Sequence, residues 1–198
     1  MCIGYDTALA GRVDGDSKQI AQGLRGRDEE LIDALVGSYQ ARLIRYLTFL
    51  LGRREMAEDV AQETWLRVLE RGHTYDGRSR FEPWLFAIAR NLAVDRLRQR
   101  RVLSFESDGE ADGRAGVAPP VSDAPSPFTQ AARTEDAQRL ARLLDTLDPQ
   151  YREALALRFL EELSLEEVST VVGAPVSTVA SRIYRGLSAL RSQLNGGK

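Results

Sequence analysis

The C-terminal end of the chain carries polar side chains of the kinds that read DNA. From Ser177 to Gln193 there are arginines and no acidic residue. The planar guanidinium of an arginine can donate to O6 and N7 of one guanine together, which discriminates that base by about 1–3 kcal/mol. The polar residues off the apolar stripe, near the start of this segment, are Thr178, Ser181, Arg182, Tyr184 and Arg185. We expect them to face duplex DNA; the solvated face of an ordinary amphipathic helix is the alternative.

Two further polar groups lie in the N-terminal half. The segment from Phe81 to Arg101 has aromatic residues at its start and arginines at its end, a combination that can stack unpaired bases beside a charged backbone. Aromatic residues at helical spacing are more often core residues, so the pattern alone leaves both interpretations open. A polar patch earlier in the chain consists of Asp59, Gln62, Glu63 and Arg67. By itself this patch is explained equally well as a solvated helix face.

Catalytic and metal-binding patterns are missing from the sequence. Cys2 is the only cysteine and His73 the only histidine, so neither has a partner for nucleophilic or metal chemistry. No glycine-rich phosphate loop is present. Four glutamates, Glu161, Glu162, Glu166 and Glu167, are interpreted as acids at a helix start, where they stabilise the helix dipole, and not as a catalytic carboxylate pair. We therefore expect a protein that is not an enzyme, with no cofactor, no metal and no small-molecule substrate.

Charge is segregated along a chain whose net charge is only −2. Arginines cluster between Arg90 and Arg101, acids follow between Glu106 and Asp112, and no acid occurs after Glu167. This local pattern favours a nucleic-acid partner despite the acidic total. The single cysteine, the lack of a long apolar run and the lack of an export signal predict a protein of the reducing cytoplasm.

The elements that position these residues are predicted to be helices, because apolar residues recur at intervals of three and four residues. No segment sustains the alternation of apolar and polar residues that is typical of a strand. An all-α protein with two small helical domains joined by a flexible linker is expected. Residues 1–15 are predicted to be a disordered extension, residues 16–101 a four-helix bundle, residues 102–130 an acidic linker rich in proline and glycine, and residues 131–195 a second helical domain.

Helix start and stop signals divide both domains. In the first, Asp28 is a predicted N-cap and Gly52 a predicted C-cap, with helices expected over 55–71 and 81–101. In the second, apolar residues between Leu140 and Leu147 predict an amphipathic helix, and Asp148 with Pro149 begins the next. Ser164 and Glu167 form a capping box, and a break at Gly173 and Pro175 precedes the final helix. The apolar stripe predicted for that helix is Val176, Val179, Ile183, Leu187, Leu190 and Leu194. The order of short helix, glycine-containing turn and longer helix is typical of a helix-turn-helix.

Three segments together resemble a known family. They are AEDVAQETWLRVLE (57–70), FEPWLFAIARNLAVDRLRQRR (81–101) and LDPQYREALALRFLEELSLEEVSTVVGAPVSTVASRIYRGLSALR (147–191). In this order, with a linker between the second and third, they resemble regions two and four of the extracytoplasmic-function (ECF) sigma factors, group 4 of the sigma-70 family. The W-L-x-x-I-A-R-N-x-x-x-D string from Trp84 to Asp95 is the most specific part of the resemblance; a helix-turn-helix alone is not specific.

The resemblance implies partners and roles that spacing does not supply. Core RNA polymerase is the implied partner, through its β′ clamp helices and β flap, together with promoter DNA and an anti-sigma factor. Asp59, Gln62, Glu63 and Arg67 would contact the β′ clamp helices. A flipped base of the single-stranded minus-ten element would be bound by Asp76, Gly77, Arg78, Ser79, Trp84, Asn91 and Arg98. The final helix, through Thr178, Ser181, Arg182, Tyr184 and Arg185, would read the minus-thirty-five element as duplex.

The final helix departs from the family pattern at two positions. Ala180 and Leu187 stand where relatives often carry basic residues. Because phosphate contacts set affinity and its salt dependence, we expect weaker duplex binding than in a typical relative.

The resemblance favours a promoter-specificity subunit that aids DNA melting. A stand-alone helix-turn-helix regulator with an N-terminal partner-binding domain is the alternative. The patch at Asp59 to Arg67 discriminates between the two, because only the first needs it to bind polymerase. The free chain is expected to bind promoter DNA poorly until it joins core polymerase.

Overall fold

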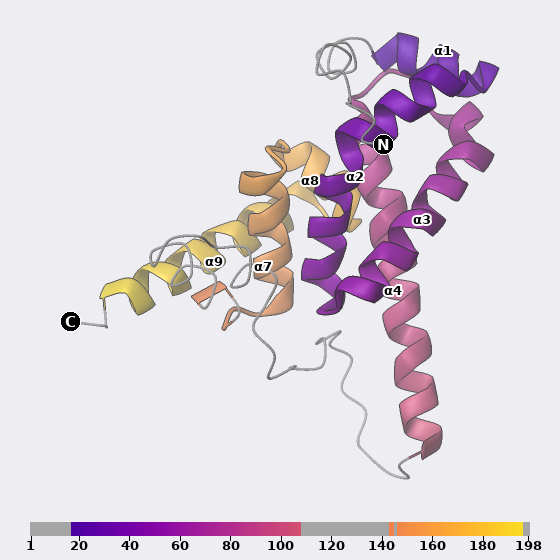
Figure 1. Ribbon diagram of the computed structural model, residues 1–198. Helices are drawn as coiled ribbons and strands as arrows, with labels where there is room; N and C mark the ends of the chain where they lie inside the picture. The colour runs from indigo at the N-terminus through magenta and orange to yellow at the C-terminus, as the bar shows by residue number, and fades with distance from the viewer. Residues whose placement is uncertain (1–16, 108–142, 145, 196–198) are drawn as a thin grey trace, which may run out of the picture.

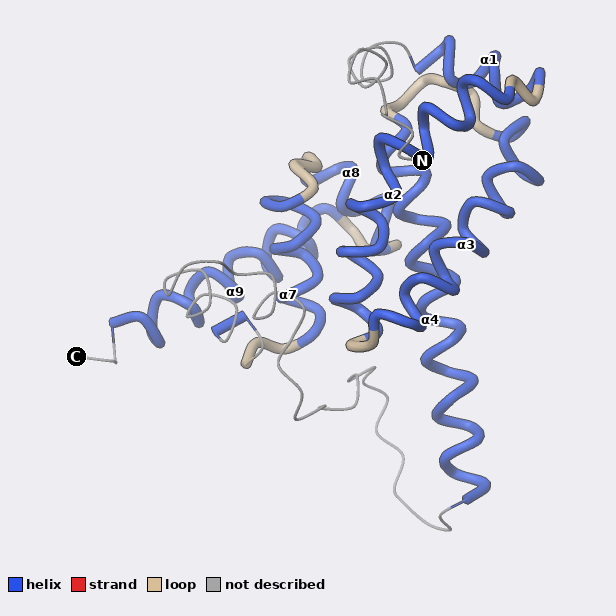
Figure 2. Tube along the Cα trace, in the orientation of Figure 1, coloured by secondary structure: helices blue, strands red, loops and turns tan. Residues whose placement is uncertain are grey.

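The residues that the computed structural model describes are 17–107, 143–144 and 146–195, and all regular structure in these ranges is helical (Figure 2). The predicted extension 1–15 and most of the predicted linker 102–130 lie outside the described residues. The elements in chain order are α1 (Ser17–Gly26), α2 (Glu29–Leu51), α3 (Arg54–Arg71), the 3-10 turn η2 (Gly72–Thr74), α4 (Phe81–Ser107), α7 (Pro149–Leu155), the π-helical turn η3 (Ala156–Leu160), α8 (Leu165–Val172) and α9 (Val176–Asn195). The all-α prediction is confirmed. None of the helices in the described ranges is long and apolar enough to span a bilayer.

Helix α2 begins and ends at the caps that the sequence predicts. The backbone N–H of Leu31 donates to Oδ1 of Asp28 at 3.2 Å, so Asp28 caps α2. At the other end Gly52 has φ +70°, and its N–H donates to the carbonyl of Thr48 at 2.8 Å. Glycine adopts this left-handed conformation without steric cost, which lets the chain turn directly into α3.

Helices α1 to α4 pack around an apolar core that includes Leu35, Leu43 and Leu47, all fully buried. Figure 1 shows α4 running through this bundle and projecting beyond it. The helix continues to Ser107, past the predicted end at Arg101. The sequence left the role of the aromatic residues open; Trp84 is half-buried and packs against the rings of Tyr75 and Phe81. Ile88 and Leu92 are likewise half-buried and pack against the core.

Helix α7 of the second domain begins as predicted at Asp148, whose Oδ1 accepts from the N–H of Gln150 at 3.0 Å with Pro149 in the first turn. The capping box of α8 is confirmed: the N–H of Ser164 donates to Glu167 at 2.7 Å, and the N–H of Glu167 donates to Oγ of Ser164 at 3.2 Å. Gly173, with φ +65°, ends α8 and turns the chain into α9. The helix expected from Leu140 lies partly outside the described residues.

Helix α9 crosses α7 in close contact at Gly186. A Cβ at this position would lie 2.9 Å from Cδ1 of Leu155, so a larger residue would force the side chain of Leu155 to shift. The contact corrects the predicted apolar stripe. Val179, Ile183 and Leu190 are buried, but Leu187 is 44% exposed and the two ends of the stripe, Val176 and Leu194, are also exposed. Gly186 faces α7 at the crossing, and the next residue, Leu187, points partly into solvent.

The two domains are in contact, with α8 packed against α4 of the first domain. Figure 1 shows the second domain lying beside α2 and α4, with α9 extending away from the bundle. The side of the bundle that carries α3 is therefore not covered by α8.

Candidate nucleic-acid interface

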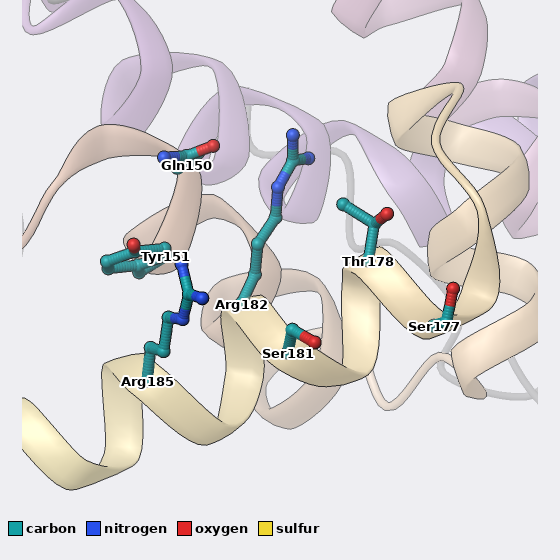
Figure 3. A pocket seen from close by; sticks show the side chains of 7 residues that line it. All are labelled: Gln150, Tyr151, Ser177, Thr178, Ser181, Arg182 and Arg185. Atoms are coloured by element: carbon teal, nitrogen blue, oxygen red, sulfur yellow. The ribbon is translucent and has the colours of Figure 1, made fainter.

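The polar residues predicted to meet duplex DNA gather at one open groove of the second domain. Thr178, Ser181, Arg182 and Arg185 line it from α9, together with Ser177. In Figure 3 the side chains of Arg182 and Arg185 extend from the same side of the helix. Tyr184, also predicted, is 75% exposed but does not line this groove. The structure thus brings together four of the five predicted residues.

Two residues of α7 complete the groove and were missed by the sequence reasoning. Gln150 and Tyr151 lie opposite Arg182 and Arg185 (Figure 3). They reach this position because α7 begins at the Asp148 cap and crosses α9 at Gly186, where Cβ of Tyr151 is 3.3 Å from the place a Cβ would take. An amide and a phenol add hydrogen-bonding groups beside the two guanidinium groups. The sequence signal for this crossing was Gly186, a glycine in the middle of the predicted final helix.

The loop between η2 and α4 presents the first residues predicted for the minus-ten element. Oδ1 of Asp76 accepts from the N–H of Arg78 at 2.9 Å, and the hydroxyl of Tyr75 donates to the carbonyl of Ser79 at 2.6 Å. Asp76, Arg78 and Ser79 are exposed. Gly77 is buried, and at φ +71° a Cβ there would lie 2.7 Å from the carbonyl of Ser17. Gly77 therefore sets the shape of the loop and presents no side chain to a ligand.

The remaining predicted residues of this group follow the loop along α4. Trp84, Asn91 and Arg98 are spaced seven residues apart, which keeps them on one side of a helix with a drift of about 20° per step. Asn91 and Arg98 are exposed, and Trp84 is half-buried beside the loop. Arg98 forms a surface ion pair with Asp95 at 3.6 Å. The loop thus leads into a line of one aromatic, one amide and one cationic side chain along α4.

The polar patch predicted on α3 combines free and paired side chains. Asp59 and Gln62 are exposed, and Asp59 forms no ion pair with any described residue. Glu63 is paired with Arg67 on the same helix at 3.7 Å and with Arg96 of α4 at 3.3 Å. Glu63 and Arg67 therefore also serve the fold, whereas Asp59 is available to a partner.

Exposed leucines extend this α3 surface beyond the predicted patch. Leu66 is 59% exposed and Leu69 is 41% exposed. The buried face of α3 ends with Val68, which is fully buried. Apolar side chains beside a polar rim are typical of protein interfaces.

Two acidic residues of the second domain lie where the sequence did not predict them. Glu166 and Glu167 are in the first turn of α8 as expected. Glu161 is not: its side chain is 2% exposed and contacts Arg42 and Arg45 of α2. Glu153 of α7 is similarly buried and contacts Arg90 of α4. Interpreting Glu161 and Glu162 as helix-dipole acids was wrong, because both precede the Ser164 cap of α8. Glu161 is buried instead by an interdomain contact with residues far away in the sequence.

Within the described ranges, no three side chains of the metal-binding types gather closely enough to hold an ion.

Comparisons with known proteins identify the family of this chain. The family model of Sigma-70 region 2 matches residues 35–102, and the family model of Sigma-70 region 4 matches residues 137–190. The chain is 32% identical over 180 residues to the ECF RNA polymerase sigma factor SigW of Bacillus subtilis, covering 89% of this chain and 95% of that protein. It is 35% identical to the ECF sigma factor SigE of Mycolicibacterium smegmatis, covering 82% of this chain and 61% of the relative.

Two solved structures with a similar fold are of proteins in complexes. CnrH, solved with the cytosolic domain of CnrY, matches with a TM-score of 0.64 at 22% identity, covering 92% of this chain and 100% of that one. RpoE of Bartonella quintana, solved with the anti-sigma factor NepR, matches with a TM-score of 0.64 at 23% identity, covering 82% and 96%. Both support the fold. The two matched regions and the identity to SigW over nearly its whole length establish that this chain belongs to the ECF sigma factors of RNA polymerase.

Proposed function

We propose that this chain directs core RNA polymerase to specific promoters and aids their melting through three separate surfaces. The surface on α3 binds polymerase, the loop at Asp76 to Ser79 with α4 binds the single-stranded minus-ten element, and the groove on α9 reads the minus-thirty-five duplex. The observation that carries the proposal is that the residues of each group lie together on one element or one groove, and the groups lie on different elements.

The polymerase surface is assigned to Asp59 and Gln62 of α3, together with the exposed Leu66 one turn further along the same helix. An exposed leucine can bury apolar area against a partner helix, and a surrounding carboxylate and amide give that contact orientation. Glu63 and Arg67 support the surface through their pairs within the first domain. The proposed partner element is the pair of β′ clamp helices.

The minus-ten assignment rests on the shape of the loop. Hydrogen bonds at Asp76 and Ser79 and the packed Gly77 hold the backbone before any ligand arrives. A preformed loop beside an aromatic side chain can accept an unstacked base with little further loss of entropy. Asn91 and Arg98 then follow the strand along α4, Arg98 as a phosphate contact.

The minus-thirty-five assignment rests on the groove between α7 and α9. Arg182 and Arg185 supply paired donors suited to guanine, and Thr178 and Ser181 supply hydroxyls to bases or phosphates. We include Gln150 and Tyr151 in this surface. The relatives are sigma factors and not enzymes, and we propose that this chain likewise has no catalytic activity of its own.

The test separates melting from polymerase binding. On a promoter recovered by run-off selection, the reconstituted polymerase should leave thymines of the minus-ten element reactive to permanganate. Arg78→Ala with Ser79→Ala should reduce this reactivity while polymerase binding is unchanged. His73→Ala, an exposed residue of the same connecting segment, is the matched control. Equal reactivity in the loop variant and the control would refute the minus-ten assignment.

The stand-alone regulator is not favoured, because the chain matches both Sigma-70 regions and its relatives are RNA polymerase sigma factors.

A further inference from the structure

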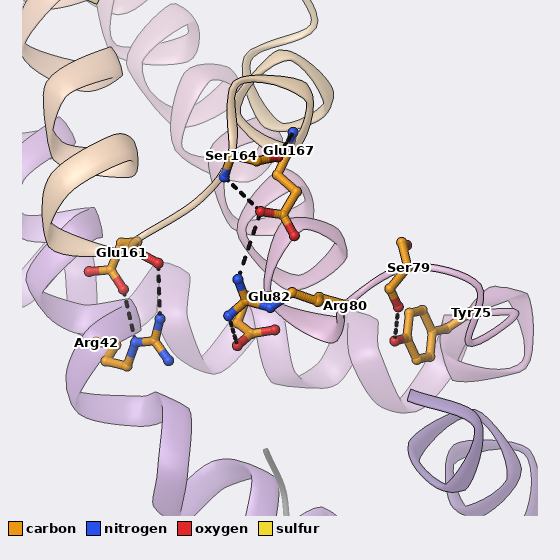
Figure 4. A network of polar contacts seen from close by, with 8 residues as sticks. All are labelled: Arg42, Tyr75, Ser79, Arg80, Glu82, Glu161, Ser164 and Glu167. Carbon is orange, nitrogen blue, oxygen red and sulfur yellow. Dashed lines mark hydrogen bonds and ion pairs between the residues drawn. The ribbon is translucent and has the colours of Figure 1, made fainter. Parts of the chain in front are cut away.

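A buried tyrosine, Tyr75, contacts two separate parts of the proposed minus-ten site. Its side chain is 2% exposed, so it presents no surface to a strand. Its hydroxyl donates to the carbonyl of Ser79 at 2.6 Å, the hydrogen bond drawn in Figure 4. Its ring packs against that of Trp84, with the ring centroids 5.3 Å apart. One buried side chain therefore links the end of the loop to the aromatic residue on α4.

An aromatic cluster holds the ring of Tyr75 independently of its hydroxyl. Phe81, the first residue of α4, is 1% exposed, and its ring centroid lies 5.5 Å from that of Tyr75. The Phe81 ring also contacts Trp84 at 5.7 Å and Tyr39 of α2 at 5.5 Å. Ring pairs at such distances stabilise one another beyond the area that they bury. The hydroxyl of Tyr75 can therefore be removed without dismantling the cluster.

Helix α1 contacts the same loop through its first residue, Ser17. The side chain of Ser17 is hydrogen-bonded to that of Tyr75. The backbone of Ser17 lies against Gly77, where a Cβ would be 2.7 Å from the Ser17 carbonyl and 3.1 Å from Cβ of Ala21. Ala21 and Leu24 are buried and anchor α1 in the bundle. Ser17 thus joins the anchored helix to the loop at two points.

The phenol of Tyr75 keeps its proton at physiological pH. Burial raises the pKa of Tyr75 above its ordinary value, and the hydrogen bond from Ser17 lowers the pKa only in part. The hydroxyl therefore donates to Ser79 while its oxygen accepts from Ser17. A chain of two hydrogen bonds runs in this way from α1 through Tyr75 to the loop.

This chain differs from the other hydrogen bond of the loop. The bond between Asp76 and Arg78 closes the loop on itself, whereas the bond from Tyr75 to Ser79 ties the loop to the core. A site that reads a base by hydrogen bonds depends on polar groups held at fixed positions. Loosening the tie would therefore weaken the distinction between bases more than the overall fold.

We propose that Tyr75 and Ser17 are positioning residues that determine how strictly the loop selects the flipped base. They act through the backbone of the loop and the ring of Trp84, and they do not contact DNA themselves. The proposal rests on the proposed function, because the loop must bind the minus-ten strand for its position to matter. It makes α1 a part of the promoter-reading site.

The test measures base discrimination by polymerase reconstituted with the full chain. The probe is a fluorescent single-stranded oligonucleotide with the minus-ten sequence of a selected promoter, in which each base is substituted in turn. Discrimination is the ratio of the affinities for the matched and the substituted oligonucleotide. Tyr75→Phe should lower this ratio at the flipped base by about 2- to 10-fold, the effect of one net hydrogen bond. Ser17→Ala should lower the ratio at the same base.

Two matched controls remove comparable groups elsewhere. Tyr46 is another buried tyrosine of the first domain, and its hydroxyl donates to Glu153 at 3.1 Å, so Tyr46→Phe makes the same chemical change away from the loop. Gln19→Ala changes an exposed residue of α1. Both controls should keep the wild-type ratio, and all four variants should bind polymerase with wild-type affinity.

Three results would overturn the proposal. Wild-type discrimination in Tyr75→Phe would remove the role of the hydroxyl, and wild-type discrimination in Ser17→Ala would remove the role of α1. An equal loss of discrimination in the controls would assign the effect to general destabilisation.

A double-mutant cycle separates positioning from an independent effect. In a chain that already carries Arg78→Ala with Ser79→Ala, Tyr75→Phe should lower the ratio less than it does in the wild-type chain. An equal loss would contradict action through the loop. Wild-type discrimination in the loop variant would refute the minus-ten assignment itself. A loss there with no loss in Tyr75→Phe would overturn only the positioning role, so the two failures are distinguishable.

Discussion

Replacing Asp59 with arginine tests the polymerase surface with little effect on the fold. Asp59 is exposed and forms no ion pair with the described residues, so Asp59→Arg should change the free energy of unfolding by no more than about 0.5 kcal/mol. Truncating or reversing one charge of a paired interface contact costs about 2–5 kcal/mol of binding free energy. At about 1.4 kcal/mol per factor of ten, the affinity for core polymerase should fall from about 30-fold to a few thousand-fold.

The assay is equilibrium binding of labelled chain to core polymerase, beside denaturant unfolding of the same variants. Glu55→Arg is the matched control, because it makes the same charge change on the same helix at a side chain that is 85% exposed. The control should bind polymerase nearly as the wild type does. The reasoning is refuted if Asp59→Arg binds polymerase with wild-type affinity, or if its loss of affinity is matched by a loss of folding stability.

Three other predictions concern the second domain and its contact with the first. Arg185→Ala should remove about 1–3 kcal/mol of preference between minus-thirty-five sequences in competition assays without changing polymerase affinity; loss of both would assign the residue to folding. Leu187→Arg should tighten duplex binding by the reconstituted polymerase and steepen the slope of log affinity against log salt by about one; an unchanged slope would mean that this side chain faces away from phosphate. Burial, with the charge of Glu153, raises the pKa of Tyr46 well above its ordinary value. Its stabilising contribution is therefore complete below about pH 10 and is lost as pH rises through the folded-state pKa. Tyr46→Phe should flatten the fall in the free energy of unfolding above pH 10, and an unchanged slope would show that another group titrates there.

Local signals in the sequence were sufficient for most of the fold. Helix caps form hydrogen bonds only with residues a few positions away, so the sequence identifies them without knowledge of tertiary packing. The caps identified in this way are Asp28, Gly52, Ser164 and Gly173. The α9 groove was also predictable in part, because helical periodicity places Thr178, Ser181, Arg182 and Arg185 on neighbouring positions.

Contacts between elements were not predictable in the same way. Leu187 interrupts the expected stripe because α7 approaches α9 at Gly186, and Gln150 and Tyr151 join the groove through the same crossing. Glu161 appeared to belong to an acidic helix start because periodicity contains no information about Arg42, which lies in the other domain. Residues whose role depends on a distant partner therefore need the structure.

The central claim is that this chain gives core RNA polymerase its promoter specificity. Run-off transcription on a genomic DNA library, with core polymerase and with or without the chain, tests it most directly. We predict that adding the chain yields discrete transcripts whose start sites share two upstream elements, and that Asp59→Arg removes them. Transcripts that are the same with and without the chain, while the chain alone binds duplex DNA tightly and specifically at physiological salt, would contradict the claim.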